Sequence, residues 1–117
     1  MQQPTGVVYD PIGYQFLVAS SSSNQVFVAS TINQQVSAFS VGINPFSIAY
    51  NPYSSTLVTT NTESGTMTVV DLLARQVRSV ITVNSGSHFA VAINPWTNVA
   101  TVADAVDNTL VFIPLPR

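Results

Sequence analysis

Residues 51–71 read NPYSSTLVTTNTESGTMTVVD, and this stretch decides the fold of the chain. A turn built on Asn51-Pro52 leads into a run rich in threonine and valine. A polar segment that ends at Gly65 follows, and a second valine-rich run ends at Asp71. Runs of β-branched residues bounded by proline, asparagine and glycine are typical of short strands joined by tight turns. We therefore predict two strands connected by a hairpin here.

The same pattern occurs once before this stretch and once after it. The dipeptides Asp10-Pro11, Asn51-Pro52 and Asn94-Pro95 are separated by 41 and then 43 residues. The two additional residues of the second spacing fall near 84–87, between repeats, where a loop accommodates them at little cost. Four short strands repeated about every forty residues are the sequence signature of a β-propeller blade.

The strands predicted for each repeat follow from this alignment. In the first repeat they cover 5–9, 15–20, 25–30 and 35–41, and in the second 46–50, 56–60, 66–71 and 76–83. The third repeat has three, at 89–93, 98–103 and 109–113, because Pro114 and Pro116 end strand pairing. We predict no helix, and we assign 72–75 to a loop.

The fold prediction is therefore all-β, with two four-stranded blades and a three-stranded third. The chain forms one domain, 1–117, with blade repeats at about 4–42, 45–84 and 88–117. The first strand of each blade is expected to lie innermost, beside a central channel. The small apolar segments 47–49 and 90–92 suit that crowded position.

Charged residues make up only 7% of the chain, which carries a formal net charge of −2 and no lysine. Three scattered arginines cannot form a basic surface that follows phosphates, so we expect no nucleic-acid partner. The absence of cysteine removes disulfides and thiolate chemistry. No apolar run reaches the length of a membrane span. The low charge and the many threonines, serines and asparagines favour an extracytoplasmic location: secreted, periplasmic or at the cell surface.

Two segments of the second repeat resemble a known family. Residues 59–71, TTNTESGTMTVVD, followed by 78–83, RSVITV, are similar to a repeat of the YVTN-type β-propellers, which are related to propellers with NHL repeats. The resemblance covers nearly the whole chain and is weakest in the first repeat, where Ser20 replaces the asparagine and Ser30 the aspartate. It implies a propeller fold and, for most members, a bacterial or archaeal surface or exported protein. It implies no particular activity.

Propellers close with roughly four to eight blades, and this chain has fewer than three complete ones. An open arc leaves an apolar blade face exposed at each end. Three resolutions are open: two copies close a six-bladed ring as a homodimer, the chain is a slice of a longer propeller, or it is an engineered or permuted fragment that oligomerises. We expect the homodimer.

No catalytic, cofactor-binding or metal-binding residues are predicted. If a ligand binds, we expect it at the channel mouth near Pro4, Pro45 and His88, which occupy equivalent positions in the three repeats. His88 is the only histidine, and a solvent-facing loop position also accounts for it. The acidic residues of the hairpin turns, Glu63, Asp104 and Asp107, lack the spacing of a dedicated calcium loop.

The leading functional hypothesis is a non-enzymatic scaffold or interaction module, without a cofactor, that self-assembles and binds a protein or glycan. One alternative is an enzyme of the NHL-related lyase or hydrolase type, with a site shared between subunits at the channel. A carbohydrate-binding module is the other. The aromatic residues Tyr9, Tyr50, Tyr53 and Trp96 could stack on sugars, but their repeat-equivalent positions favour a structural packing role.

Overall fold

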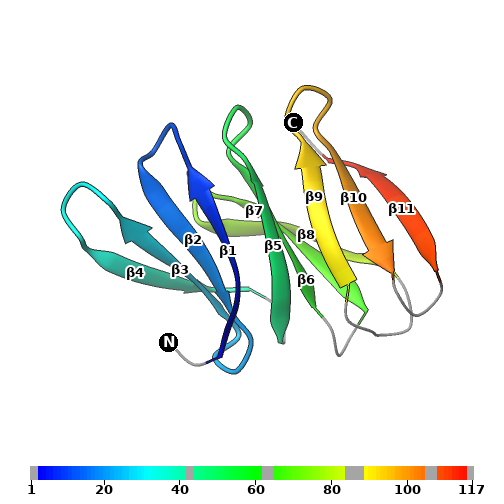
Figure 1. Cartoon of the computed structure of the whole chain (residues 1–117), viewed down its shortest axis with the longest axis horizontal. Helices are drawn as coiled ribbons and strands as arrows, with labels where there is room; N and C mark the ends of the chain where they lie inside the picture. Colours follow the sequence, from blue (N-terminus) through cyan, green and yellow to red (C-terminus); the bar gives the residue numbers. More distant parts are fainter. Residues whose placement is uncertain (1–2, 42–43, 62–64, 84–88, 105–107, 116–117) are drawn as a thin grey trace.

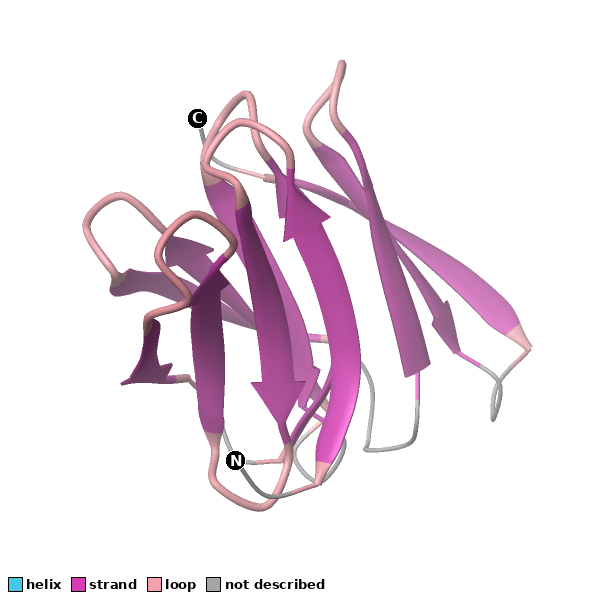
Figure 2. Cartoon of the chain, turned by 60° about the vertical axis from the view of Figure 1, so that its left-hand side comes forward, coloured by secondary structure: helices cyan, strands magenta, loops and turns pink. Residues whose placement is uncertain are grey.

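Eleven strands form three antiparallel sheets in the computed structural model, which describes residues 3–41, 44–61, 65–83, 89–104 and 108–115. Figures 1 and 2 show the sheets standing side by side as a twisted fan. The described residues contain no helix, and the segment 72–75 is a turn, as predicted. The all-β fold and the division into sheets of four, four and three strands are confirmed.

Each sheet contains one sequence repeat, with its strands in chain order. The first sheet has β1 (Pro4–Asp10), β2 (Gln15–Ser20), β3 (Gln25–Ser30) and β4 (Val36–Ser40). The second has β5 (Pro45–Asn51), β6 (Thr56–Asn61), β7 (Thr66–Asp71) and β8 (Gln76–Thr82). The third has β9 (Phe89–Asn94), β10 (Val99–Asp104) and β11 (Thr109–Pro114).

The predicted strand boundaries differ from the observed ones by at most one residue. The first strand of each sheet extends to the Asx residue that we had placed in the turn. Asp10 pairs with Gln15, for example, and Asn51 with Thr56. The reason is that an Asx residue can serve both elements at once: its backbone stays in the ladder while its side chain accepts hydrogen bonds from the turn amides.

The backbone repeats the 41- and 43-residue spacings. Tyr14, Ser55 and Asn98 occupy equivalent turn positions and have φ angles of 54°, 54° and 58°. Asn24 and Gly65 are likewise equivalent to each other, with φ angles of 56° and 65°. The left-handed conformation is unfavourable for most side chains, so its recurrence at the same point of each repeat shows that the turn geometry itself is repeated.

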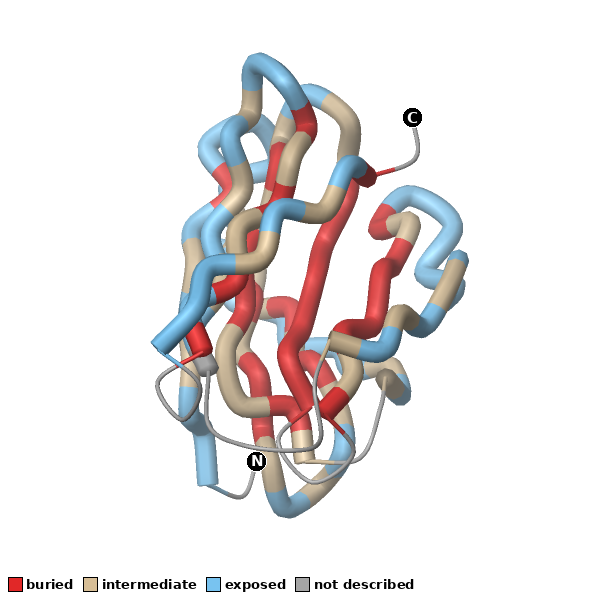
Figure 3. Tube along the Cα trace, turned by 90° about the vertical axis from the view of Figure 1, so that its right-hand side faces the viewer, coloured by how far each residue is buried: buried red, intermediate tan, exposed pale blue. Residues whose placement is uncertain are grey.

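Two apolar clusters hold the three sheets together. The first lies between the first and second sheets: Leu17, Ala19, Val26, Val28, Ile48, Leu57, Val70 and Leu72. The second lies between the second and third sheets: Ala49, Val58, Met67, Val69, Ala100, Val102 and Leu115. The second sheet is therefore covered on both faces, and every residue of β6 is buried. Figure 3 shows the buried positions gathered in the middle of the molecule.

A buried polar network also stabilises the second sheet. The side-chain amide of Asn61 donates to Thr68 Oγ1 at 2.7 Å and to Thr66 Oγ1 at 3.1 Å. Thr59 Oγ1 lies 3.4 Å from the amide oxygen of Asn61. No buried side-chain nitrogen or oxygen in the described ranges lacks a partner. Paired in this way, threonine and asparagine can occupy a core, because their hydrogen bonds offset the cost of desolvation.

The innermost strands β1, β5 and β9 lie next to one another across the sheets (Figure 1). Thr5 Oγ1 donates to the Pro45 carbonyl at 3.1 Å, which joins β1 to β5. A side chain at Gly6 would bring its Cβ to 3.2 Å from the carbonyl oxygen of Phe46. The predicted inner position of these strands is thus observed, and glycine allows the first pair to approach closely.

Within the described ranges, two sheet faces have no neighbouring sheet. The outer face of the first sheet, hereafter outer face 1, consists of Val7, Tyr9, Phe16, Val18, Phe27, Ala29, Val36 and Ala38. The outer face of the third sheet, hereafter outer face 3, consists of Ala90, Ala92, Thr101, Ala103, Leu110 and Phe112. Their cross-strand pairing and their alternation with the clustered residues define both sets. Val7 is 61% exposed and Phe112 65%.

Candidate functional site between the first and second sheets

The predicted channel-mouth residues are only partly within the described structure. Pro4 begins β1 and Pro45 begins β5, so both lie at the same end of adjacent inner strands. Pro4 is exposed, whereas Pro45 is buried. His88 lies outside the described residues. A ligand site formed by these three residues stays a prediction.

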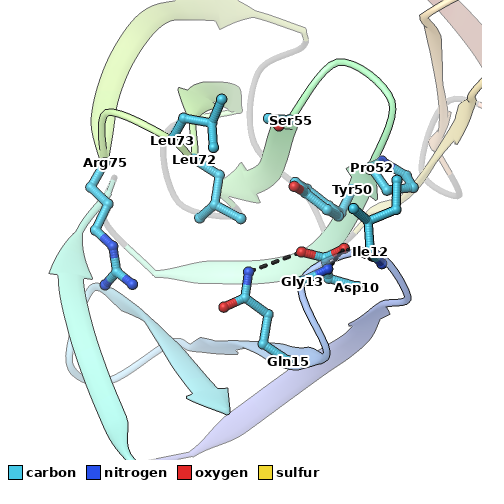
Figure 4. A pocket seen from close by; sticks show the side chains of 10 residues that line it. All are labelled: Asp10, Ile12, Gly13, Gln15, Tyr50, Pro52, Ser55, Leu72, Leu73 and Arg75. Atoms are coloured by element: carbon cyan, nitrogen blue, oxygen red, sulfur yellow. Dashed lines mark hydrogen bonds between the residues drawn. The ribbon is translucent and has the colours of Figure 1, made fainter. Parts of the chain in front are cut away.

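A cavity of about 300 Å³ opens at the opposite end of the strands, between the first and second sheets. It is formed where the turn after β1 meets the turns before β6 and β8 (Figure 4). Its lining residues are Asp10, Ile12, Gly13, Gln15, Tyr50, Pro52, Ser55, Leu72, Leu73 and Arg75. Sequence analysis did not single out this place.

Asp10 lies at the base of the cavity and is 3% exposed. Its Oδ1 accepts hydrogen bonds from the backbone amides of Ile12 and Gly13, each at 3.0 Å. Its Oδ2 accepts a bond from Gln15 Nε2 at 2.9 Å (Figure 4). The carboxylate therefore organises the turn, and its lone pairs are directed at protein donors.

Tyr50 brings a phenol to the same carboxylate from the second sheet. Burial raises the pKa of Tyr50 above its ordinary value of 10.0; a hydrogen bond from Ser55 opposes this rise, and the negative charge of Asp10 and the phenol's hydrogen bond to it add to it. The neutral phenol that donates to Asp10 is thus the favoured form. Tyr50, Ser55 and Asp10 form a polar link between the two sheets.

The raised pKa of Tyr50 leads to a prediction for alkaline solution. A proton held more tightly in the folded state contributes stability that is complete below about pH 10 and is lost as pH rises through the raised pKa. We expect the wild type to lose more free energy of unfolding between about pH 8 and pH 11 than the Tyr50→Phe variant does. Urea unfolding at both pH values measures this difference, and equal losses in the two proteins would contradict it.

The corresponding junction between the second and third sheets is bridged directly. Asn51 Nδ2 donates to Asn98 Oδ1 at 2.8 Å and to the Pro95 carbonyl at 3.2 Å. Ser54 Oγ also donates to Asn98 Oδ1, at 3.1 Å.

The repeat explains why the first junction holds a cavity at the position where Asn98 reaches across the second. Gly13 takes the place of Ser54 in the first repeat, and Ser55 takes the place of Asn98 in the second. The second replacement shortens a side chain that reaches across the junction. The space beside Gly13 is filled instead by Asp10, whose Oδ2 lies 2.5 Å from where a Cβ at Gly13 would stand. A position-by-position comparison of the repeats contains this signal, but it becomes meaningful only once the facing residues are known.

A second cavity, of about 170 Å³, continues along the same junction towards β4. Gln15 and Arg75 line both cavities. Arg75 Nη1 donates to Ser37 Oγ at 2.7 Å and so connects the second sheet to the first. We call the two cavities together the junction groove.

Exposed apolar side chains surround this end of the molecule. Ile12, Tyr53 and Trp96 each follow an Asx-Pro pair, and Tyr53 and Trp96 are 70% and 75% exposed. The rings of Tyr53 and Trp96 meet edge to face with centroids 5.7 Å apart. Tyr53 and Trp96 thus pack on each other at the Asx-Pro bends, but they join neither buried cluster, because the bend turns both side chains outward. Tyr50, in contrast, packs against the first cluster.

The acidic turn residues do not assemble a metal site in the part of the chain that the structure describes. No group of three or more His, Cys, Asp or Glu side chains is found there. Asp104 is buried at the end of β10, and Glu63 and Asp107 lie outside the described residues. No helix of the described residues could span a membrane.

Solved structures share this arrangement of sheets. The chain aligns with hydrazine synthase of Kuenenia stuttgartiensis at a TM-score of 0.75 and 22% identity, over 95% of this chain and 35% of that one. It aligns with U3-55K at a TM-score of 0.75 and 12% identity, over 95% of this chain and 38% of that one. With the WD40 repeats of RRP9 the TM-score is 0.75 and the identity 12%, over 97% of this chain and 39% of that one.

These likenesses show the fold, which is that of consecutive β-propeller blades. The chain spans about two fifths or less of each of these three proteins. No family model and no curated protein matches the sequence.

Proposed function

We propose that this chain is a self-assembling propeller scaffold of the YVTN type, in which two copies join head to tail to close a six-bladed ring. The observation that carries the proposal is the pair of apolar outer faces on the first and third blades. Each outer face is one side of a sheet, and the other side of that sheet already packs against the second blade.

The two outer faces match the two kinds of surface that meet inside the molecule. Outer face 1 is equivalent in the repeat to the side of the second blade that packs on the first, so Val7 and Tyr9 correspond to Ile48 and Tyr50. Outer face 3 is equivalent to the side of the second blade that packs on the third, so Leu110 and Phe112 correspond to Met67 and Val69. A junction between outer face 3 and outer face 1 would therefore repeat the kind of contact that already joins the first blade to the second and the second to the third.

The free energy gained by burying one outer face is comparable with the stability of a whole domain. Burying about 400 Å² of apolar surface contributes roughly 10 kcal/mol at about 25 cal/mol per Å². That is similar to the whole free energy of unfolding of a typical domain, about 5–15 kcal/mol. Two such junctions in a closed dimer would offset the entropy of association and leave a stable ring.

The proposed role is non-enzymatic, and the low charge of the chain supports an extracytoplasmic location. The motif at 59–71 supports the YVTN assignment: the described part of it includes Asn61, whose buried amide joins β6 to β7 through two threonines.

Solution mass tests the assembly. Light scattering coupled to size-exclusion chromatography should give about 25 kDa, twice the 12.5 kDa of one chain, at micromolar concentration. Dilution should not shift the mass until the concentration falls well below micromolar. A mass of one chain throughout would contradict the closed dimer.

A further inference from the structure

We propose that the junction groove binds a neutral saccharide, with the Tyr53–Trp96 pair providing an adjacent stacking surface. This site lies at the opposite end of the strands from the predicted channel mouth, and it goes beyond the scaffold role. The proposal rests on three properties of the groove: its polar lining, its charge, and the aromatic rings beside it.

The lining of the groove suits hydroxyl groups. Gln15 donates to Asp10 through its amide nitrogen and Ser37 accepts from Arg75, which leaves the Gln15 amide oxygen and the Ser37 hydroxyl hydrogen for a ligand. Amides and hydroxyls that can donate and accept recur along the length of the groove: Gln15, Ser30, Asn33, Gln35, Ser37 and Ser55. Sugar hydroxyls have the same dual character, so each can pair with such a group in either direction. Leu72 and Leu73 add apolar surface against which a sugar ring can pack.

The charges at the groove are already engaged. The carboxylate of Asp10 is buried and accepts bonds from two backbone amides and from Gln15. It therefore offers little to a cationic ligand. Arg75 is exposed at the rim and donates to Ser37. One bound carboxylate and one guanidinium of opposite sign leave the site close to neutral, which favours an uncharged ligand over a charged one.

One exposed aromatic residue belongs to the turn that forms one wall of the groove. Pro52 and Ser55 line the groove, and Tyr53 lies between them in the chain with its ring exposed. Trp96 contacts that ring from the third blade. The weakly positive C–H face of a sugar is attracted to the negative face of an aromatic ring. A saccharide of several units could thus occupy the groove and extend onto the aromatic pair.

The second junction provides a reference for how the groove can be closed. There, Asn98 stands at the position of Ser55 and bonds to Asn51 and Ser54 across the blades. The variant Ser55→Asn transfers this side chain to the first junction. Both residues occur naturally at this turn position with the same left-handed backbone, so the change is compatible with the fold.

Intrinsic fluorescence gives a direct readout, because Trp96 is the only tryptophan. We would titrate the full chain with cellohexaose, maltohexaose, xylohexaose and chitohexaose, and with a proline-rich peptide of similar length. We expect a saturable change in Trp96 emission with at least one hexasaccharide. Ser55→Asn should weaken that binding at least tenfold, and Thr82→Ala, an exposed change at the far end of β8, should leave it unaltered.

Calorimetry with the same saccharide should show a similar loss for Trp96→Ala, which lacks the fluorescent reporter. Circular dichroism and solution mass confirm that each variant keeps its fold and assembly. Absence of binding by all four hexasaccharides in both assays would overturn the proposal. So would equal affinity of Ser55→Asn and wild type, or a response to the peptide alone.

Discussion

Replacing Phe112 by aspartate is expected to reduce the solution mass from two chains to one. Phe112 is 65% exposed in the single chain and lies in outer face 3, which the proposed ring buries against outer face 1. An unpaired carboxylate at that point costs several kcal/mol to desolvate, and the closed dimer contains the change twice. Light scattering on the variant measures the effect. Val80→Asp on β8, also exposed but outside both outer faces, is the matched control and should remain a dimer.

A mixing experiment distinguishes a head-to-tail ring from a symmetric contact. The variant Val7→Asp damages outer face 1 and should also be a single chain. Mixed with Phe112→Asp, it provides one undamaged outer face 3 for the undamaged outer face 1 of the other variant. One of the two junctions is then intact, so a species with the mass of two chains should reappear at high concentration. Failure of the mixture to associate would contradict head-to-tail pairing.

Replacing Leu57 by alanine is expected to cost about 2–5 kcal/mol of the free energy of unfolding. Leu57 lies on β6, is fully buried, and belongs to the cluster between the first and second blades. The lost methyl groups leave a cavity that rigid neighbouring strands cannot fill. Urea unfolding at a fixed protein concentration measures the loss, since the proposed association would contribute to apparent stability.

Leu73 provides the control for this substitution. It is 85% exposed in the turn after β7, so Leu73→Ala should change the free energy of unfolding by less than about 0.5 kcal/mol. Because both variants replace leucine by alanine, they differ only in how far the leucine side chain is buried. Equal effects at the two positions would mean that the first cluster does not hold the blades together.

Local chemistry made the strands predictable. The Asx-Pro pairs, the β-branched runs and the regular spacing mark each turn and strand, and they act within a few residues of one another. The left-handed turn residues at positions such as Ser55 and Asn98 recur because the same short segments fold in the same way. Distant contacts were not needed to place these elements.

The site was less accessible to sequence reasoning. Tyr53 and Trp96 were expected to pack because they recur in the repeat, but recurrence fixes a position in the blade and leaves open whether that position faces the core or solvent. The Asx-Pro turn directs these two rings outward. Tyr50, three residues before Tyr53, faces a cluster because it belongs to a strand that packs against the preceding blade.

The amino-acid sequence by itself determined the all-β class, the three repeats and the strand boundaries to within one residue, because these depend on short-range backbone preferences. Only the tertiary structure decided which side chains meet between blades. Ser55 is an ordinary turn residue along the chain, and its short side chain leaves room in the groove only because the blades place it opposite Asp10 and Gly13 in one junction. The cavity is formed by surfaces of two different blades, and blade packing decides which surfaces face each other.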